Sequence, residues 1–157
     1  MQRLRRRLDN DRGTSAVEFA IVLPVFLLLV FGGLTFGLGL SAKAVFNEAA
    51  AGGARAAVGP YQAAYSAAIT NGQSPSQAQA AGEAAAGTYA QQQAQNVVNG
   101  AGSIYSRSFT VPTPTFAQCA SNQGTLCITV SVSGAPPINI GFGLPSSVNA
   151  SYTVAVQ

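Results

Sequence analysis

The chain has 157 residues, and only 8% of them are charged, against roughly 25% in ordinary soluble domains. The net charge of +3 arises within the first 13 residues, and the rest of the chain is neutral. The few bases after residue 13 are too far apart to neutralise a run of phosphates, which argues against a nucleic-acid-binding face.

Catalytic chemistry is equally hard to assemble from this composition. The chain contains no histidine, so no serine or cysteine has a histidine as its base. It also has no phosphate-binding glycine loop and no cluster of metal ligands. We therefore expect no enzyme activity, no cofactor, no metal and no small-molecule substrate.

Residues 1–13 form a short basic leader for which we predict no regular structure. It carries five arginines and two aspartates and lies directly before an apolar run. Arginines beside an apolar span hold that end of a chain in the cytoplasm. The sequence therefore predicts a cytoplasmic N-terminus.

The apolar run extends from Phe19 to Leu40 and contains no charged residue. As a helix it would span about 33 Å, which matches the hydrocarbon core of a bilayer. The run predicts a single transmembrane helix, with the later residues outside the cytoplasm.

Residues 14–58 are predicted to form one long helix that contains this span. Ser15 and Glu18 fit a capping box at its start, and Pro24 should kink it. Gly33 and Gly37 form a GxxxG pattern, which in membranes permits close approach of a second helix. The Gly59-Pro60 pair is predicted to end the helix.

Residues 59–102 are rich in Ala and Gln and predict two more helices. The first is expected over Tyr61–Ile69, and a break follows at residues 71–75. Ser74 is the expected N-cap of the second helix, with Gln77 completing a capping box. That helix should run from Ser76 to about Val98, and its Ala-rich face needs a packing partner because alanine buries little area.

Residues 103–157 change to a period of two, which predicts three or four short strands. Apolar residues alternate with Ser, Thr and Cys from Leu126 to Val132 and again from Tyr152 to Val156, and Tyr105, Phe109 and Val111 are expected to point the same way. The fold class is therefore α+β, with a long N-terminal helix, Ala-rich helices and a small antiparallel sheet.

Cys119 and Cys127 are the only cysteines and lie eight residues apart in this last region. A metal site would need more ligands than their surroundings offer. An exported domain favours a disulfide instead, worth roughly 2.5 kcal/mol in the loop-entropy model.

The junction between Gly13 and Thr14 is the remaining motif. The basic leader ends in a glycine, whose bare backbone an endopeptidase can bind, and Glu18 stands at the fifth position of the product. A carboxylate at a membrane edge costs a few kcal/mol unless it is paired. A newly freed amine of Thr14 on a neighbouring subunit is a natural partner.

From Arg12 to Pro24 the sequence Arg-Gly-Thr-Ser-Ala-Val-Glu-Phe-Ala-Ile-Val-Leu-Pro resembles the N-terminal signature of the TadE-like proteins. These are minor pilins or pseudopilins of the Tad (Flp) pilus, a branch of type IV pilus systems. The resemblance extends to about residue 58 through Phe46-Asn47-Glu-Ala-Ala and Gly53-Ala-Arg55-Ala, and beyond that it is only architectural.

The resemblance implies cleavage by a membrane prepilin peptidase between Gly13 and Thr14. It also implies that Glu18 and Phe19 act in recognition and subunit assembly. Thr14 departs from the Phe that begins many type IV pilins. The implied partners are the peptidase, other Tad subunits, the inner-membrane assembly platform and membrane lipid, and the implied location is the bacterial inner membrane, with possible incorporation into a surface pilus.

An alternative interpretation is a secreted or surface binding domain with an ordinary signal peptide. Ala42-Lys-Ala44 imitates a signal-peptidase site, and cleavage after Ala44 would release a soluble protein. Against this, signal cores are usually about 7–15 residues long, and the apolar run here is longer and is preceded by Glu18.

Overall fold

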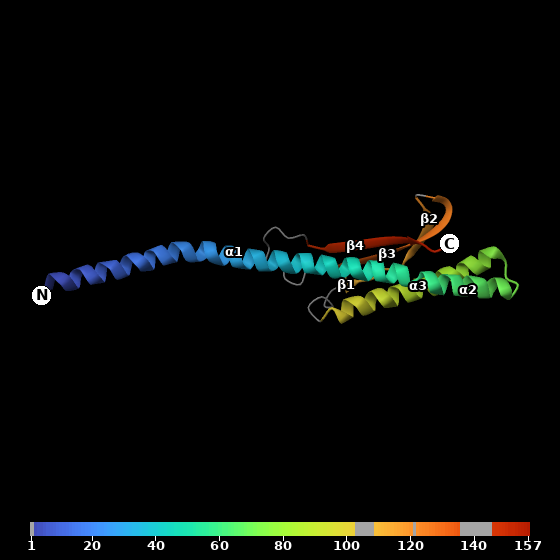
Figure 1. Ribbon diagram of the computed structural model, residues 1–157, viewed down its shortest axis with the longest axis horizontal. Helices are drawn as coiled ribbons and strands as arrows, with labels where there is room; N and C mark the ends of the chain where they lie inside the picture. The colour runs from blue at the N-terminus through green and yellow to red at the C-terminus, as the bar shows by residue number, and fades with distance from the viewer. Residues whose placement is uncertain (1, 103–108, 121, 136–145) are drawn as a thin grey trace. The chain divides into compact units, whose positions relative to one another are not determined.

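The computed structural model describes residues 2–102, 109–120, 122–135 and 146–157, with the backbone alone for residues 2–13 and 122–123. Within these residues, helices come first and strands follow (Figure 1). The elements are α1 (Gln2–Ala56), α2 (Val58–Thr70), α3 (Pro75–Gly100), β1 (Phe109–Thr110), β2 (Thr115–Cys119), β3 (Asn122–Gly134) and β4 (Val148–Ala155). The α+β class with a long N-terminal helix is confirmed.

Helix α1 begins at Gln2, so it includes the basic leader for which no structure was predicted. Ser15 therefore lies inside the helix of the uncleaved chain, and the prediction that it starts the helix is wrong there. Arginine and leucine, which dominate the first turns, are strong helix formers, and one glycine inside a helix costs only about 1 kcal/mol. Gly13 is therefore not enough to stop the helix.

The prediction that Gly59-Pro60 ends the long helix is also wrong. The Ala57 N–H donates to the Gly53 carbonyl at 3.2 Å, and the Tyr61 N–H donates to the Ala57 carbonyl at 3.0 Å. The chain thus passes from α1 into α2 with a break at Ala57 only. Pro60 falls in the first turn of α2, where a missing N–H is tolerated, so it marks the break without ending the helical run.

The turn before α3 follows the sequence prediction closely. Gly72 adopts a φ of 77°, a conformation that glycine tolerates without strain. The Ser74 hydroxyl accepts from the Gln77 N–H, and the Ser74 N–H donates to Gln77 Oε1 at 3.1 Å. Pro75 takes the first helical position. The predicted N-cap and capping box are confirmed.

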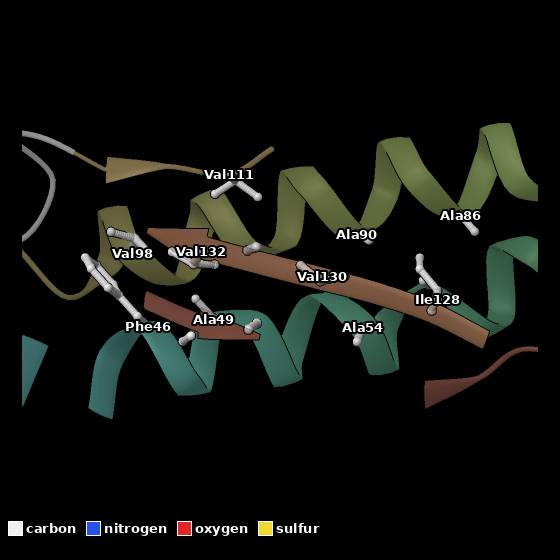
Figure 2. Packing of buried hydrophobic residues seen from close by; sticks show 14 of the residues in the cluster. Phe46, Ala49, Ala54, Ala86, Ala90, Val98, Val111, Ile128, Val130 and Val132 are labelled. Atoms are coloured by element: carbon white, nitrogen blue, oxygen red, sulfur yellow. The ribbon is translucent and has the colours of Figure 1, made fainter. Parts of the chain in front are cut away.

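Helices α1 and α3 pack through small residues. Ala49 and Ala54 of α1 and Ala86 and Ala90 of α3 are fully buried in one apolar cluster (Figure 2). At Gly53, a Cβ would lie only 2.7 Å from the Ala90 carbonyl oxygen, so the helices approach to backbone contact. The Ala-rich face of α3 thus finds the partner that it needs in the C-terminal part of α1.

Strand β3 is the centre of the antiparallel sheet. It pairs with β4 along one side and with β1 and β2 along the other. Ile128, Val130 and Val132 are fully buried against the helices, as their alternation predicted, and Figure 2 shows β3 running along α1 and α3. Strand β2 was not predicted, because Phe116 is its only large apolar residue, and Tyr105 lies outside the described residues.

Two side-chain contacts attach the C-terminal strand to the helices. The Arg55 guanidinium lies over the Tyr152 ring, 5.2 Å from its centroid, and also donates to the Tyr152 hydroxyl at 3.3 Å. The Tyr61 hydroxyl donates to Oε1 of Gln157 at 2.8 Å. In the sheet itself, the predicted disulfide between Cys119 and Cys127 is present and joins the end of β2 to β3.

We expect Tyr61→Phe to lower the free energy of unfolding by about 1 kcal/mol, because it removes the hydrogen bond to Gln157. Burial, and then the negative charge of Glu83 and the neighbouring Tyr65, raise the pKa of Tyr61 above its ordinary value of 10.0. The stability contributed by the neutral hydroxyl is thus fully present below pH 10.0 and is lost as pH rises through the raised pKa. Urea unfolding at increasing alkaline pH measures both effects, and Tyr89→Phe, on the exposed side of α3, is the control.

Candidate membrane and assembly segment

The first part of α1 exposes an unusual number of large apolar side chains. From residue 14 to residue 40, almost every position is solvent-exposed in the chain by itself. The exposed large apolar residues are Val17, Phe19, Ile21, Val22, Val25, Phe26, Leu27, Leu28, Leu29, Val30, Phe31, Leu34, Phe36 and Leu40. Water is a poor solvent for such a surface, so this part of the helix requires an apolar environment.

By length and composition, the helical run Thr14–Thr70 contains a stretch able to cross a membrane. Hardly any of that stretch is buried within the chain, which distinguishes it from the core helix of a soluble domain. Burial begins near the predicted outer boundary: Leu38 and Gly39 are half-buried, and Ala42 is the first fully buried alanine. The helix therefore changes from a lipid-compatible surface to a packed one close to residue 40.

Glu18 and Phe19 lie at the N-terminal edge of this apolar surface, and both side chains are exposed. Glu18 stands four residues after Thr14, so the two share a face of the helix. The Gly13–Thr14 bond lies within the backbone of α1. The predicted processing and recognition residues thus fall on consecutive turns of one helix.

Gly33 and Gly37 lie further along, again on one face because they are four residues apart. Apart from the adjacent residues and the backbone of the surrounding helical turns, no described atom comes within 4 Å of a Cβ built on either glycine. Gly53, by contrast, is a glycine because α3 lies against it. Close packing inside the subunit therefore does not explain Gly33 and Gly37, and the prediction that a second helix packs there stays a prediction.

Thr35 is the buried polar residue of this segment. Its hydroxyl bonds to the carbonyl oxygens of Phe31 at 2.7 Å and Gly32 at 3.0 Å. A threonine bonded back to its own helix satisfies its hydroxyl without water, as an apolar environment demands. The one polar side chain among these turns is thus compatible with lipid.

The structure brings Cys119 and Cys127 together in the sheet, and the other predicted site residues follow one another along α1. In the described ranges no three His, Cys, Asp or Glu side chains gather to hold a metal ion. The sequence indicated only that Gly53 and Arg55 belong to a helix. The packing of Gly53 against α3 and the contact of Arg55 with Tyr152 were therefore not predicted.

Comparison with known families supports the same segment. The family model of TadE-like protein matches residues 13–55, and this confirms the resemblance noted in the sequence for about a quarter of the chain. No curated protein and no solved structure matches the chain. The matched segment and the candidate membrane helix together fit a membrane protein associated with a Tad pilus.

Proposed function

We propose that this chain is a TadE-like pseudopilin or minor pilin, a membrane-anchored structural component of a Tad (Flp) pilus that prepilin peptidase matures by cleavage after Gly13. One observation carries the proposal: the family match begins at Gly13 and extends over the exposed apolar turns of α1. Because α1 begins at Gln2, cleavage there requires the helix to open locally at the Gly13–Thr14 bond, where the glycine already lowers helix stability.

The proposed location is the bacterial inner membrane, with the N-terminus in the cytoplasm and the domain that follows residue 40 outside. The arginine-rich leader supports this orientation through the positive-inside tendency. The disulfide supports an oxidising compartment for the sheet. The proposed partners are prepilin peptidase, other pilus subunits, the assembly platform and lipid.

The signal-peptide alternative conflicts with the packing of α1. Cleavage after Ala44 would remove Ala42, which is 1% exposed and therefore buried within the chain. It would also leave Phe46, 1% exposed, at the frayed second residue of the product. A signal peptide is normally dispensable to the mature fold, whereas this segment supplies buried side chains.

We expect the mature protein extracted from membranes to begin at Thr14. Intact-mass measurement with N-terminal sequencing distinguishes this product from two rivals. A plain anchor keeps Met1, and signal-peptidase cleavage gives Val45. Finding Val45 would overturn the proposal in favour of a secreted domain, and finding Met1 would remove the peptidase from it.

We expect Glu18→Gln to abolish or strongly reduce pilus assembly while leaving the amount of membrane-inserted protein unchanged. Glutamine keeps the size and hydrogen-bonding capacity of the side chain, so helix stability changes little. Only the charge that would pair with the Thr14 amine of a neighbouring subunit is lost. Piliation counted by electron microscopy measures the effect, and Glu83→Gln on α3, which removes the same charge and keeps an oxygen to accept from Gln79, is the control. Normal piliation in Glu18→Gln would show that the charge has no assembly role.

A further inference from the structure

Strand β4 leaves one edge of the sheet open. Each of its residues pairs with β3, from Val148 opposite Gly134 to Ala155 opposite Cys127. Within the described residues, no strand pairs with the other side of β4. The backbone groups on that side are therefore hydrogen-bond donors and acceptors that have no partner in the sheet.

The register identifies the residues that carry these free groups. The Val156 N–H donates to the Leu126 carbonyl at 2.8 Å, so these two opposite residues form a hydrogen-bonded pair. In an antiparallel ladder such pairs alternate with pairs that make no bond to each other. Even-numbered residues of β4 therefore bond to β3, and odd-numbered residues turn their N–H and carbonyl groups to the open edge. The odd-numbered residues are all exposed: Asn149, Ser151, Thr153 and Ala155.

The opposite margin of the sheet is protected in ways that β4 is not. There β1 is two residues long, and the register of β2 shifts between Gln118 and Cys119. Pro112 and Pro114 lie between these two strands. Short strands, irregular register and prolines all discourage the addition of another strand. β4 has no charged residue, no proline and no register shift, so its edge is a template for an added strand.

A cation lies beside the middle of this edge. Tyr152 alternates with the buried Val148 and Ala150, so it points to the helix side of β4. The Arg55 guanidinium lies over its ring, 5.2 Å from the centroid. The neighbour of Tyr152 on β3, Val130, is fully buried, whereas Tyr152 is 36% exposed. The accessible part of the ring, with Arg55 over it, therefore lies on the side away from β3.

Arg55 has binding capacity that the described chain does not use. It is exposed, and the hydrogen bond that it makes to the Tyr152 hydroxyl is a long one at 3.3 Å. Among the described residues no carboxylate pairs with its guanidinium. A guanidinium has five N–H donors in a planar fork that matches a carboxylate. An acidic side chain on an added strand is thus the complementary group.

Backbone and charge together define the partner. A strand added to β4 turns every second side chain to the helix side, where Arg55 lies. We propose that the open edge of β4 binds an extended segment of another protein, with an aspartate or glutamate beside Tyr152 that pairs with Arg55. Main-chain hydrogen bonds give such a contact its affinity, and the side chains of alternate residues give it specificity.

The positions of the charges indicate a different protein and not a second copy. A second β4 edge brings no carboxylate, because residues 148–155 contain none. It brings a second Arg55 to the same side of the joined sheet, where like charges repel each other. All the aspartates and glutamates of this chain lie in helices and not in an extended segment: Asp9, Asp11, Glu18, Glu48 and Glu83.

The test titrates full-length protein in detergent micelles with a blocked peptide, Thr-Val-Thr-Glu-Thr-Val-Thr, that carries a neutral fluorophore. Its glutamate and valines share one face of an extended strand. A peptide with glutamine in place of the glutamate is the control. We expect fluorescence anisotropy to give a Kd roughly tenfold lower for the glutamate peptide, because hydrogen bonds to a charged group are stronger. Equal affinity for the two peptides would overturn the proposal.

A pair of protein variants assigns the preference to Arg55. Arg55→Gln keeps a donor for the Tyr152 hydroxyl, and it should bind both peptides with the weaker affinity. Lys43→Gln loses the same charge from an exposed position on the same helix, and it should keep the roughly tenfold preference. Loss of the preference in both variants, or in neither, would overturn the pairing with Arg55.

The backbone contact has its own test. Thr153→Pro removes an N–H that points to the open edge and breaks no bond to β3, so it should weaken both peptides roughly tenfold. Peptides N-methylated on one or the other set of alternate residues test the same contact on the unmodified protein. Only the peptide whose methyl groups face β4 should lose binding. Equal binding of the two methylated peptides would overturn the proposal, as would a protein dimer in micelles that Thr153→Pro dissociates. None of these results bears on cleavage at Gly13.

Discussion

Gly53→Ala is expected to destabilise the packed domain by about 3 kcal/mol, the upper end of the usual cost of overpacking. A Cβ on Gly53 would lie 2.7 Å from the Ala90 carbonyl oxygen and 3.2 Å from the Ala94 Cβ. The first of these atoms belongs to the backbone of α3, so no side chain can rotate to make room. The two helices must separate, and the cluster of small buried residues between them loses contact along its length.

Two other glycines provide a graded control series. At Gly82 the added Cβ would meet the ring of Tyr61 at 2.9 Å, and a ring can shift, so Gly82→Ala should cost less than Gly53→Ala. At Gly59 an added Cβ would meet no described atom within 4 Å beyond the adjacent residues and the backbone of its own helical turns, so Gly59→Ala should be neutral or stabilising by up to about 1 kcal/mol. Urea unfolding of the three variants in detergent, followed by near-ultraviolet circular dichroism, gives the order. Equal stability of Gly53→Ala and Gly59→Ala would contradict the helix contact.

Local signals in the sequence predicted those parts of the fold that depend on near neighbours. The capping box at Ser74 needs only residues three apart, and the alternation from Leu126 to Val132 needs only one strand with one buried face. Both are confirmed. The Cys119–Cys127 pair was also accessible, because a chain with two cysteines has only one internal pairing.

The parts that depend on distant neighbours could not be predicted in the same way. Gly53 looks like any small residue in a helical period until α3 lies against it, 37 residues later at Ala90. Strand β2 has little apolar signal and is held by pairing with β3 and by the disulfide. Pro60 was interpreted as the end of a helix. The sequence does not show that the helix already breaks at Ala57, and this break places Pro60 in the first turn of α2.

The candidate site also has one part that local sequence could predict and another part that it could not. The exposed apolar turns of α1 were predictable because a membrane helix makes its backbone hydrogen bonds within itself. The apolar composition of the segment is then enough to predict it. The proposed cleavage position and the proposed role of Glu18 depend on partners outside the chain, so the structure supplies their place on the helix and no contact that would explain them. The resemblance from Arg12 to Pro24 is what connects these positions to processing.

Gly13→Val is expected to block maturation almost completely, leaving the full-length precursor in the membrane. The proposed peptidase must bind the backbone on the leader side of the Gly13–Thr14 bond closely, and valine places a branched Cβ there. In the proposed orientation, the retained leader keeps its positive charge at the cytoplasmic face, where it opposes extraction of the helix from the membrane. We therefore expect no piliation as well as no cleavage, measured by intact mass and by electron microscopy of the same cells.

Gly32→Val separates this effect from general damage to α1. Gly32 lies in the same helix, and beyond its own helical turns no described atom comes within 4 Å of its Cβ position, so valine fits there and lies among apolar residues. Its chain should insert and mature to Thr14 as the unmodified chain does. If Gly13→Val also matures to Thr14, the peptidase does not require this glycine, and the pseudopilin assignment loses the one chemical step that connects the leader, the glycine and Glu18.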